Sequence, residues 1–188
     1  MKCSVYIATS LDGYIAKPDG SLDWLMSAGN PEADLGEDAD MGFKEHMTSV
    51  DCMIMGRKCM QVIDAMALTS EQWPYGDTRI IVLSKTLKEV PTGLVGRVEI
   101  FSGGIPSLME KLGAEGFKHA YVDGGVTIQN FIALGLINEM TITRAPVLIG
   151  EGIPLFGKIQ KDIKLEKTSV KAFANDFVQE FYQVNYLN

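Results

Sequence analysis

The chain has 188 residues, of which 46% are hydrophobic and 22% charged, and its net charge is −7. This length suits one domain with a sizeable core, and this composition is that of a globular protein and not of a disordered one. The negative charge argues against binding to duplex nucleic acid, because such binding needs a basic surface.

The sequence contains no apolar run of the roughly 18–20 residues that a membrane helix requires. Its first residues, Met1–Ala8, lack a long apolar stretch with a cleavage site, so they predict a first strand and not a signal peptide. Cys3, Cys52 and Cys59 have no Cys-x-x-Cys spacing, and we expect free thiols. These features favour a cytoplasmic protein that works without membrane or nucleic acid.

Apolar runs rich in β-branched residues predict eight strands. In chain order they are Ser4–Thr9, Cys52–Met55, Arg79–Leu83, Val98–Phe101, Ala120–Val122, Glu139–Ala145, Leu165–Phe173 and Val178–Tyr186. Several are continuously apolar, as in strands covered on both faces by helices. The last two alternate more strongly and are separated by Ala174-Asn175-Asp176, which predicts an antiparallel hairpin.

Helical spacing of apolar residues appears between these strands. The predicted helices are Met41–Ser49, Lys58–Ala67, Pro106–Leu112 and Val126–Leu134, the last ended by Gly135. Strands that alternate with helices, followed by a hairpin, predict an α/β fold with a mixed, mostly parallel sheet. The ligand crevice of such a sheet lies at the carboxyl ends of its strands. The long loops Asp12–Asp40 and Ala67–Thr78 are candidates for binding loops or lids.

The junction Gly56-Arg57-Lys58 is the first candidate for a binding site. Glycine lets backbone approach a ligand, and a helix start presents free N–H groups to an anion. Two cations there could grip a phosphate, although they could also simply solvate the helix start, which is electrostatically the wrong end for them. Leu83-Ser84-Lys85 follows another strand and would add a hydroxyl and a cation, unless it is a plain turn. Together these groups favour the 2′-phosphate of NADP.

The segment Asp123-Gly124-Gly125-Val126-Thr127 is the second candidate. A strand runs into two glycines and then a helix, so that backbone N–H groups could hold a pyrophosphate. The alternative is an ordinary turn, and the full G-x-G-x-x-G fingerprint is missing.

The loop after the first strand is the third candidate. Asp12 and Trp24 could line a pocket for a flat heterocycle. Asp12 could equally be a turn residue before Gly13, and Trp24 a plug over the core.

In their order along the chain, these segments resemble the dihydrofolate reductase superfamily and its RibD C-terminal domain-like branch. The matching stretches are Ser10–Ala16, Asp23-Trp24-Leu25, Asp51–Lys58, Val82-Leu83-Ser84, Asp123-Gly124-Gly125, Gly135–Glu139 and Pro146–Phe156. The resemblance covers essentially the whole chain, 1–188, as one domain. It is specific for the fold and the cofactor site but not for the substrate.

The resemblance implies a dihydrofolate reductase-like, eight-stranded, mostly parallel mixed sheet with flanking helices. It also implies NADPH as hydride donor, a homodimer, and a small heterocyclic acceptor. The expected activity is that of a 5-amino-6-(5-phosphoribosylamino)uracil reductase of riboflavin biosynthesis. The alternatives are dihydrofolate reduction and a non-catalytic NADPH-binding protein.

The resemblance also assigns roles to residues. Ala8 and Ile15 would contact the nicotinamide, and Leu11 and Trp24 the substrate. A carboxylate, Asp12 or Asp40, would steer or relay the proton. The adenosine phosphate would be held by Gly56, Arg57, Lys58, Leu83 and Ser84, and the pyrophosphate by Gly124, Gly125, Val126 and Thr127.

Two departures from the family pattern concern this site. Counting back from Phe43-Lys44 puts Ala39 at the position of the buried acid of dihydrofolate reductases, whereas counting back from Gly56 selects Asp40. Cys59-Met60-Gln61 also replaces the Thr-Tyr-Glu that is typical of relatives, so genuine dihydrofolate reduction is not the favoured activity.

Overall fold

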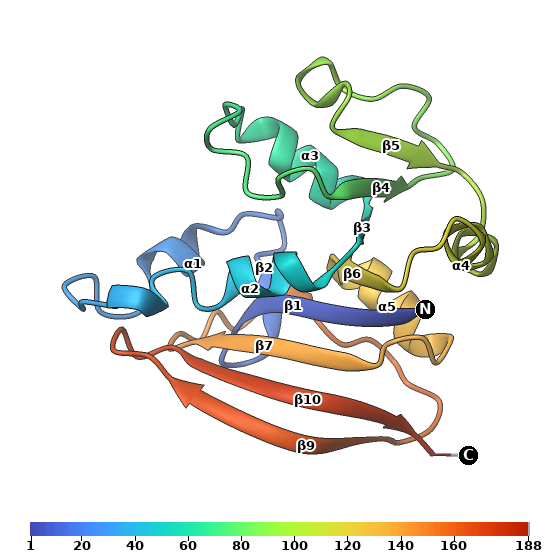
Figure 1. The fold of residues 1–188 in the computed structure, drawn as a ribbon. Helices are drawn as coiled ribbons and strands as arrows, with labels where there is room; N and C mark the ends of the chain where they lie inside the picture. Colours follow the sequence, from blue (N-terminus) through green and yellow to red (C-terminus); the bar gives the residue numbers. More distant parts are fainter. Residues whose placement is uncertain (188) are drawn as a thin grey trace.

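One sheet of eight strands runs through the molecule in the order β5-β4-β3-β6-β1-β7-β10-β9 (Figure 1). The computed structural model describes residues 1–187. The parallel strands are β1 (Lys2–Ser10), β3 (Cys52–Gly56), β4 (Arg79–Leu83), β5 (Val98–Phe101), β6 (His119–Asp123) and β7 (Glu139–Ala145). The hairpin of β9 (Ile163–Ala172) and β10 (Val178–Tyr186) completes the sheet, with β10 antiparallel to β7.

Helices cover both faces of the sheet. On one face α4 (Ile105–Ala114) and α5 (Gly125–Ala133) pack on Val5, Ile54 and Ile142. On the other face α2 (Phe43–Ser49) and α3 (Arg57–Ala65) pack on Met53 and Val82. The central strands β3 and β4 therefore have apolar side chains on both faces, as their continuously apolar sequences predict.

The predicted strands and helices are confirmed, with ends that move by at most two residues. The hairpin turn is confirmed too, since Asp176 takes a positive φ of 70° between β9 and β10. Gly135 ends α5 with a φ of 69°, and Leu136 N–H donates to Phe131 C=O across the helix end. The mixed, mostly parallel sheet of eight strands is the expected fold.

The segment Asp12–Asp40 is more ordered than a long loop. It contains β2 (Tyr14–Ala16), the helix α1 (Asp23–Ser27) and a 3-10 turn at Gly36–Asp38. β2 pairs with β8 (Ile153–Pro154), so a long-range contact that local spacing does not reveal fixes this segment. A second 3-10 turn, Thr92–Leu94, precedes β5. Within residues 1–187 we find no helix long and apolar enough to span a membrane.

Candidate functional site

Strand register brings the predicted anion-binding segments to one edge of the sheet. Gly56 pairs with Leu83 on β4, and Met55 pairs with Asp123 on β6. The residues that follow these strands therefore meet at the carboxyl edge, as parallel strands require. A Cβ added to Gly56 would stand 2.9 Å from Oγ1 of Thr127 on α5, so the two glycine segments are in direct contact.

The glycines here are required by neighbouring protein atoms. A Cβ on Gly124, which has a φ of 90°, would stand 2.3 Å from Sγ of Cys59 on α3. A Cβ on Gly125 would stand 2.8 Å from Cδ1 of Ile15 on β2. We expected glycine to admit a ligand; the structure instead assigns these positions to the close packing of α3, α5 and β2.

The start of α5 is mostly buried, with Gly125 and Thr127 inside and Val126 exposed. The first helical hydrogen bond there runs from Ile128 N–H to Gly124 C=O. The N–H groups of Gly125, Val126 and Thr127 precede it and have no partner within the helix. We call the segment Gly124–Thr127 the cradle, because its amides and the helix dipole suit an anion.

Arg57 and Lys58 lie exposed in the first turn of α3, and neither makes an ion pair within residues 1–187. Ser84 follows β4 next to them, and its hydroxyl accepts the amides of Thr86 and Leu87 at 3.4 and 3.0 Å. Ser84 therefore stabilises a turn, which was one of the two roles considered for it. Its hydroxyl hydrogen and the two cations can still bind a phosphate.

The expected nicotinamide side lies next to the cradle. Ile15 touches Gly125, and Ala8 on β1 is partly buried beside Thr143 of β7. Leu11 is 56% exposed and its amide donates to Val147 C=O at 2.8 Å. Of these three residues, Ile15 is the one that contacts the cradle.

Asp12 ties this turn to the segment that follows β7. Its carboxylate accepts the Ser10 hydroxyl and the amides of Gly150 at 2.8 Å and Ile149 at 3.4 Å. These hydrogen bonds, that of Ser10 foremost, hold the pKa of Asp12 below its usual value. Such a group suits loop positioning better than donation of a proton at neutral pH.

Asp40 has a comparable local task. Its carboxylate accepts the amides of Lys44 at 3.0 Å and Gly42 at 3.1 Å, at the start of α2. The amide of Lys44, followed by that of Gly42, lowers the pKa of Asp40. Asp38, two residues before Asp40, forms an ion pair with Lys171 on β9.

Trp24 is only 3% exposed. It packs with Ala145, Phe173 and Phe177 in a small cluster at the carboxyl end of the sheet. Its indole N–H is buried and has no hydrogen-bond partner among the described residues. This packing fits the alternative in which Trp24 covers the core. Contact between Trp24 and the substrate stays a prediction.

Asp123 is a functional candidate that the sequence analysis did not assign. It ends β6 directly before the cradle, and burial raises its pKa to about 6 despite the Gly124 amide and the Cys59 thiol. Two residues earlier on the same face, Tyr121 is buried and donates its hydroxyl to Tyr6 C=O at 2.8 Å. A carboxyl group that titrates near neutrality can exchange a proton with a bound molecule. In the sequence, the one sign of this role is that Asp123 directly precedes two glycines.

Aromatic side chains surround this part of the sheet face. Tyr6 stacks on His46 at 4.9 Å between ring centroids, and Phe43 lies 6.3 Å from Tyr75. Gln179 on β10 donates to Tyr6 Oη, Met41 C=O and Thr143 Oγ1, which fixes Tyr6. Tyr6, Phe43 and Tyr75 thus pack mostly edge to face, and we call these three side chains the aromatic wall.

Comparisons with known proteins agree on one family. Residues 2–179 match the family model described as the RibD C-terminal domain. The uncharacterised protein YwjB of Bacillus subtilis (strain 168) is 30% identical over 173 residues, 92% of each chain.

Solved structures resemble the chain over nearly its full length. A putative riboflavin biosynthesis protein from Shewanella sp. PV-4 is 39% identical, with a TM-score of 0.87 over 99% of this chain and all of that one. A dihydrofolate reductase from Enterococcus faecalis, solved with NADP(H), has a TM-score of 0.63 at 17% identity and covers 98% and 97% of the two chains. At that identity the second likeness concerns the fold alone.

Proposed function

Because the chain belongs to the RibD C-terminal domain family, we propose that it is an NADPH-dependent reductase. The acceptor we propose is 5-amino-6-(5-phosphoribosylamino)uracil or a close relative. The observation that supports this most strongly is the meeting of Gly56, Leu83 and the cradle at one sheet edge. Within residues 1–187, that edge has amides without a helical partner and two cations without an ion pair, which would suit a phosphorylated dinucleotide.

The residues present fit the cofactor. The amides of Gly125, Val126 and Thr127 would hold the pyrophosphate. Arg57 and Lys58, helped by the Ser84 hydroxyl, would hold the 2′-phosphate that distinguishes NADPH from NADH. Ala8 and Ile15 would flank the nicotinamide, with Leu11 at the rim. NADPH supplies the hydride when bound.

The protein's own chemistry in this proposal is proton supply and orientation. Asp123, whose carboxyl group is mostly protonated below about pH 6, would supply the proton that the reduced acceptor takes up. Asp12 holds the Leu11–Gly13 turn against Gly150, which keeps the nicotinamide side closed. Asp40 orders the start of α2, whose Phe43 belongs to the aromatic wall.

The test follows NADPH oxidation with the phosphoribosylaminouracil and, in parallel, with dihydrofolate. The proposal expects turnover with the first compound and little with the second. Binding of NADPH without turnover would favour a non-catalytic binding protein. Preferred turnover of dihydrofolate would favour a dihydrofolate reductase. A protein that binds no NADPH would overturn the proposal.

The homodimer is likewise a proposal. β9 is a sheet edge of ten residues whose side chains are largely exposed on both faces. A second copy could cover such an edge. Light scattering of the purified protein distinguishes a dimer from a monomer.

A further inference from the structure

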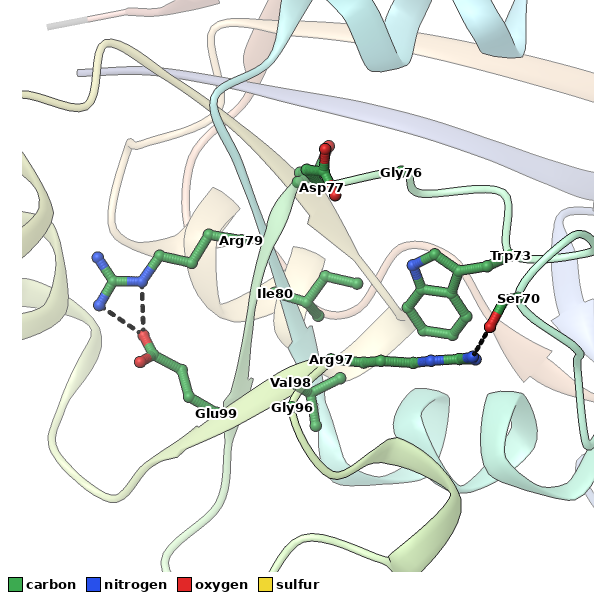
Figure 2. A pocket seen from close by; sticks show the side chains of 11 residues that line it. Ser70, Trp73, Gly76, Asp77, Arg79, Ile80, Gly96, Arg97, Val98 and Glu99 are labelled. Atoms are coloured by element: carbon green, nitrogen blue, oxygen red, sulfur yellow. Dashed lines mark hydrogen bonds and ion pairs between the residues drawn. The ribbon is translucent and has the colours of Figure 1, made fainter.

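A cavity of about 590 Å³ lies at the amino ends of β4 and β5, at the sheet edge opposite the cradle (Figure 2). It opens between the loop Ala67–Thr78 and the turn before β5. Its volume is that of a site for a small molecule. Since β4 reaches the cofactor edge only at Leu83, a ligand here would not touch the reductase site.

Arg97 on one wall of this cavity is a cation without a carboxylate partner. Its guanidinium lies 4.7 Å from the ring centre of Trp73 and donates to Leu68 C=O at 3.2 Å and Ser70 Oγ at 3.1 Å. Within residues 1–187 it forms no ion pair. Three of its five N–H donors are left for another group.

Arg79 on the opposite wall differs from Arg97. It pairs with Glu99, at 2.7 Å, and with Glu115, so its charge is compensated. Figure 2 shows the Arg79–Glu99 pair on one side and the Trp73–Arg97 stack on the other, with Ile80 and Val98 between them. Attraction for an anion is therefore confined to the Arg97 wall.

The residues at the floor and rim of the cavity limit which anions can bind near Arg97. Ile80 is fully buried, so the apolar surface that the cavity offers comes from the partly buried Val98 and Trp73. Asp77 and Glu99 also line the cavity. Their negative charges disfavour an anion with several charges, such as a phosphate ester, more than a single carboxylate.

We propose that this cavity is a second ligand site, for a small molecule with a flat apolar body and one carboxylate. The carboxylate binds the free donors of Arg97, and the ring lies on Val98 beside Trp73. A guanidinium held on an indole and by two protein acceptors is already oriented, so little entropy is lost on binding. The site is independent of the reductase function proposed above.

Benzoate is the probe that tests this site. It is titrated into the full-length protein while NMR follows the indole N–H of Trp73 and the amides of Gly124 and Gly125. We expect shifts at Trp73 and not at the cradle. We also expect benzamide, the neutral analogue, to bind at least about tenfold more weakly, because a charged hydrogen bond is lost.

Two variants and a control complete the test. Arg97→Met keeps the stem over Trp73 and should weaken benzoate at least about tenfold, whereas Arg57→Met at the opposite edge should not. Asp77→Asn removes a rim charge and should tighten benzoate binding even if Arg97→Met fails to fold. The proposal is overturned if benzoate does not bind, if it shifts the cradle instead of Trp73, or if inorganic phosphate binds more tightly. It is also overturned if a folded Arg97→Met binds benzoate as tightly as the wild type, or, where that variant does not fold, if Asp77→Asn leaves the affinity unchanged.

Discussion

The thiol of Cys59 lies against the backbone of Gly124, in the place that a side chain on Gly124 would occupy. This contact joins the start of α3 to the cradle, so the two halves of the proposed cofactor site form one packed unit. The thiol therefore fills a gap in the packing and does not act as a nucleophile, since burial raises its pKa to about 12.

Replacement of Gly124 by alanine should impair both folding and cofactor binding. The positive φ and the overlap with Cys59 together should cost about 1–3 kcal/mol of the free energy of unfolding. Gly113→Ala is the matched control, since Gly113 lies in α4 with open space around it, and alanine should be neutral or slightly stabilising there. Denaturant unfolding and NADPH titration measure the two effects. Equal stability of both variants would contradict the packing described.

The variant Asp123→Asn tests two effects of this residue: its role in catalysis, measured by kcat, and its effect on the pH dependence of stability. If Asp123 donates the proton, kcat should fall about a hundredfold while the Kd of NADPH changes little. In the wild type the pKa of Asp123 is raised from 3.8 to about 6, so the folded state binds more protons than the unfolded state between these values. Wild-type stability from this group should then fall as pH rises from about 4 to 6, and Asp123→Asn should abolish that fall. Unchanged kcat would remove Asp123 from the mechanism.

His46 should make the protein sensitive to acid. Burial, with smaller effects of His119 and Lys2, lowers the pKa of His46 from 6.5 to about 4, and its buried Nε2 has no hydrogen-bond partner among residues 1–187. The unfolded state therefore takes up a proton first, and stability should fall as pH drops from 6.5 to 4, opposite in sign to Asp123. His46→Phe keeps the stack on Tyr6 and should flatten this loss in thermal melts. If His46→Phe loses as much stability in acid as the wild type, His46 is not the cause of the acid sensitivity.

Asp12→Asn tests whether Asp12 positions the loop or supplies a proton. The asparagine side chain turns a donor toward an amide or gives up one acceptor, so the tie to Gly150 weakens. We expect KM for NADPH to rise severalfold and kcat to change little. A loss of kcat of about a hundredfold, with a flattened pH profile, would instead support the proton role.

The strands were predictable because their apolar, β-branched runs carry a local signal. β2 and α1 were not, since β2 exists through pairing with Ile153-Pro154 and Trp24 is buried by Phe173 and Phe177 from far along the chain. The same holds at the site. Gly124 and Gly56 could be predicted from strand-glycine-helix order, but the raised pKa of Asp123 comes from burial in the folded protein, which the local sequence does not reveal. Asp12 has its partner, Gly150, 138 residues away.

The account rests on a phosphorylated dinucleotide binding at the edge that holds Gly56 and the cradle. Isothermal titration of NADPH and NADH into the wild type and into Arg57→Met/Lys58→Met tests it most directly. We predict that the wild type binds NADPH at least about tenfold more tightly than NADH, and that the double variant loses this preference without losing affinity for NADH. Equal affinity of the wild type for both nucleotides, or binding of neither, would contradict the account.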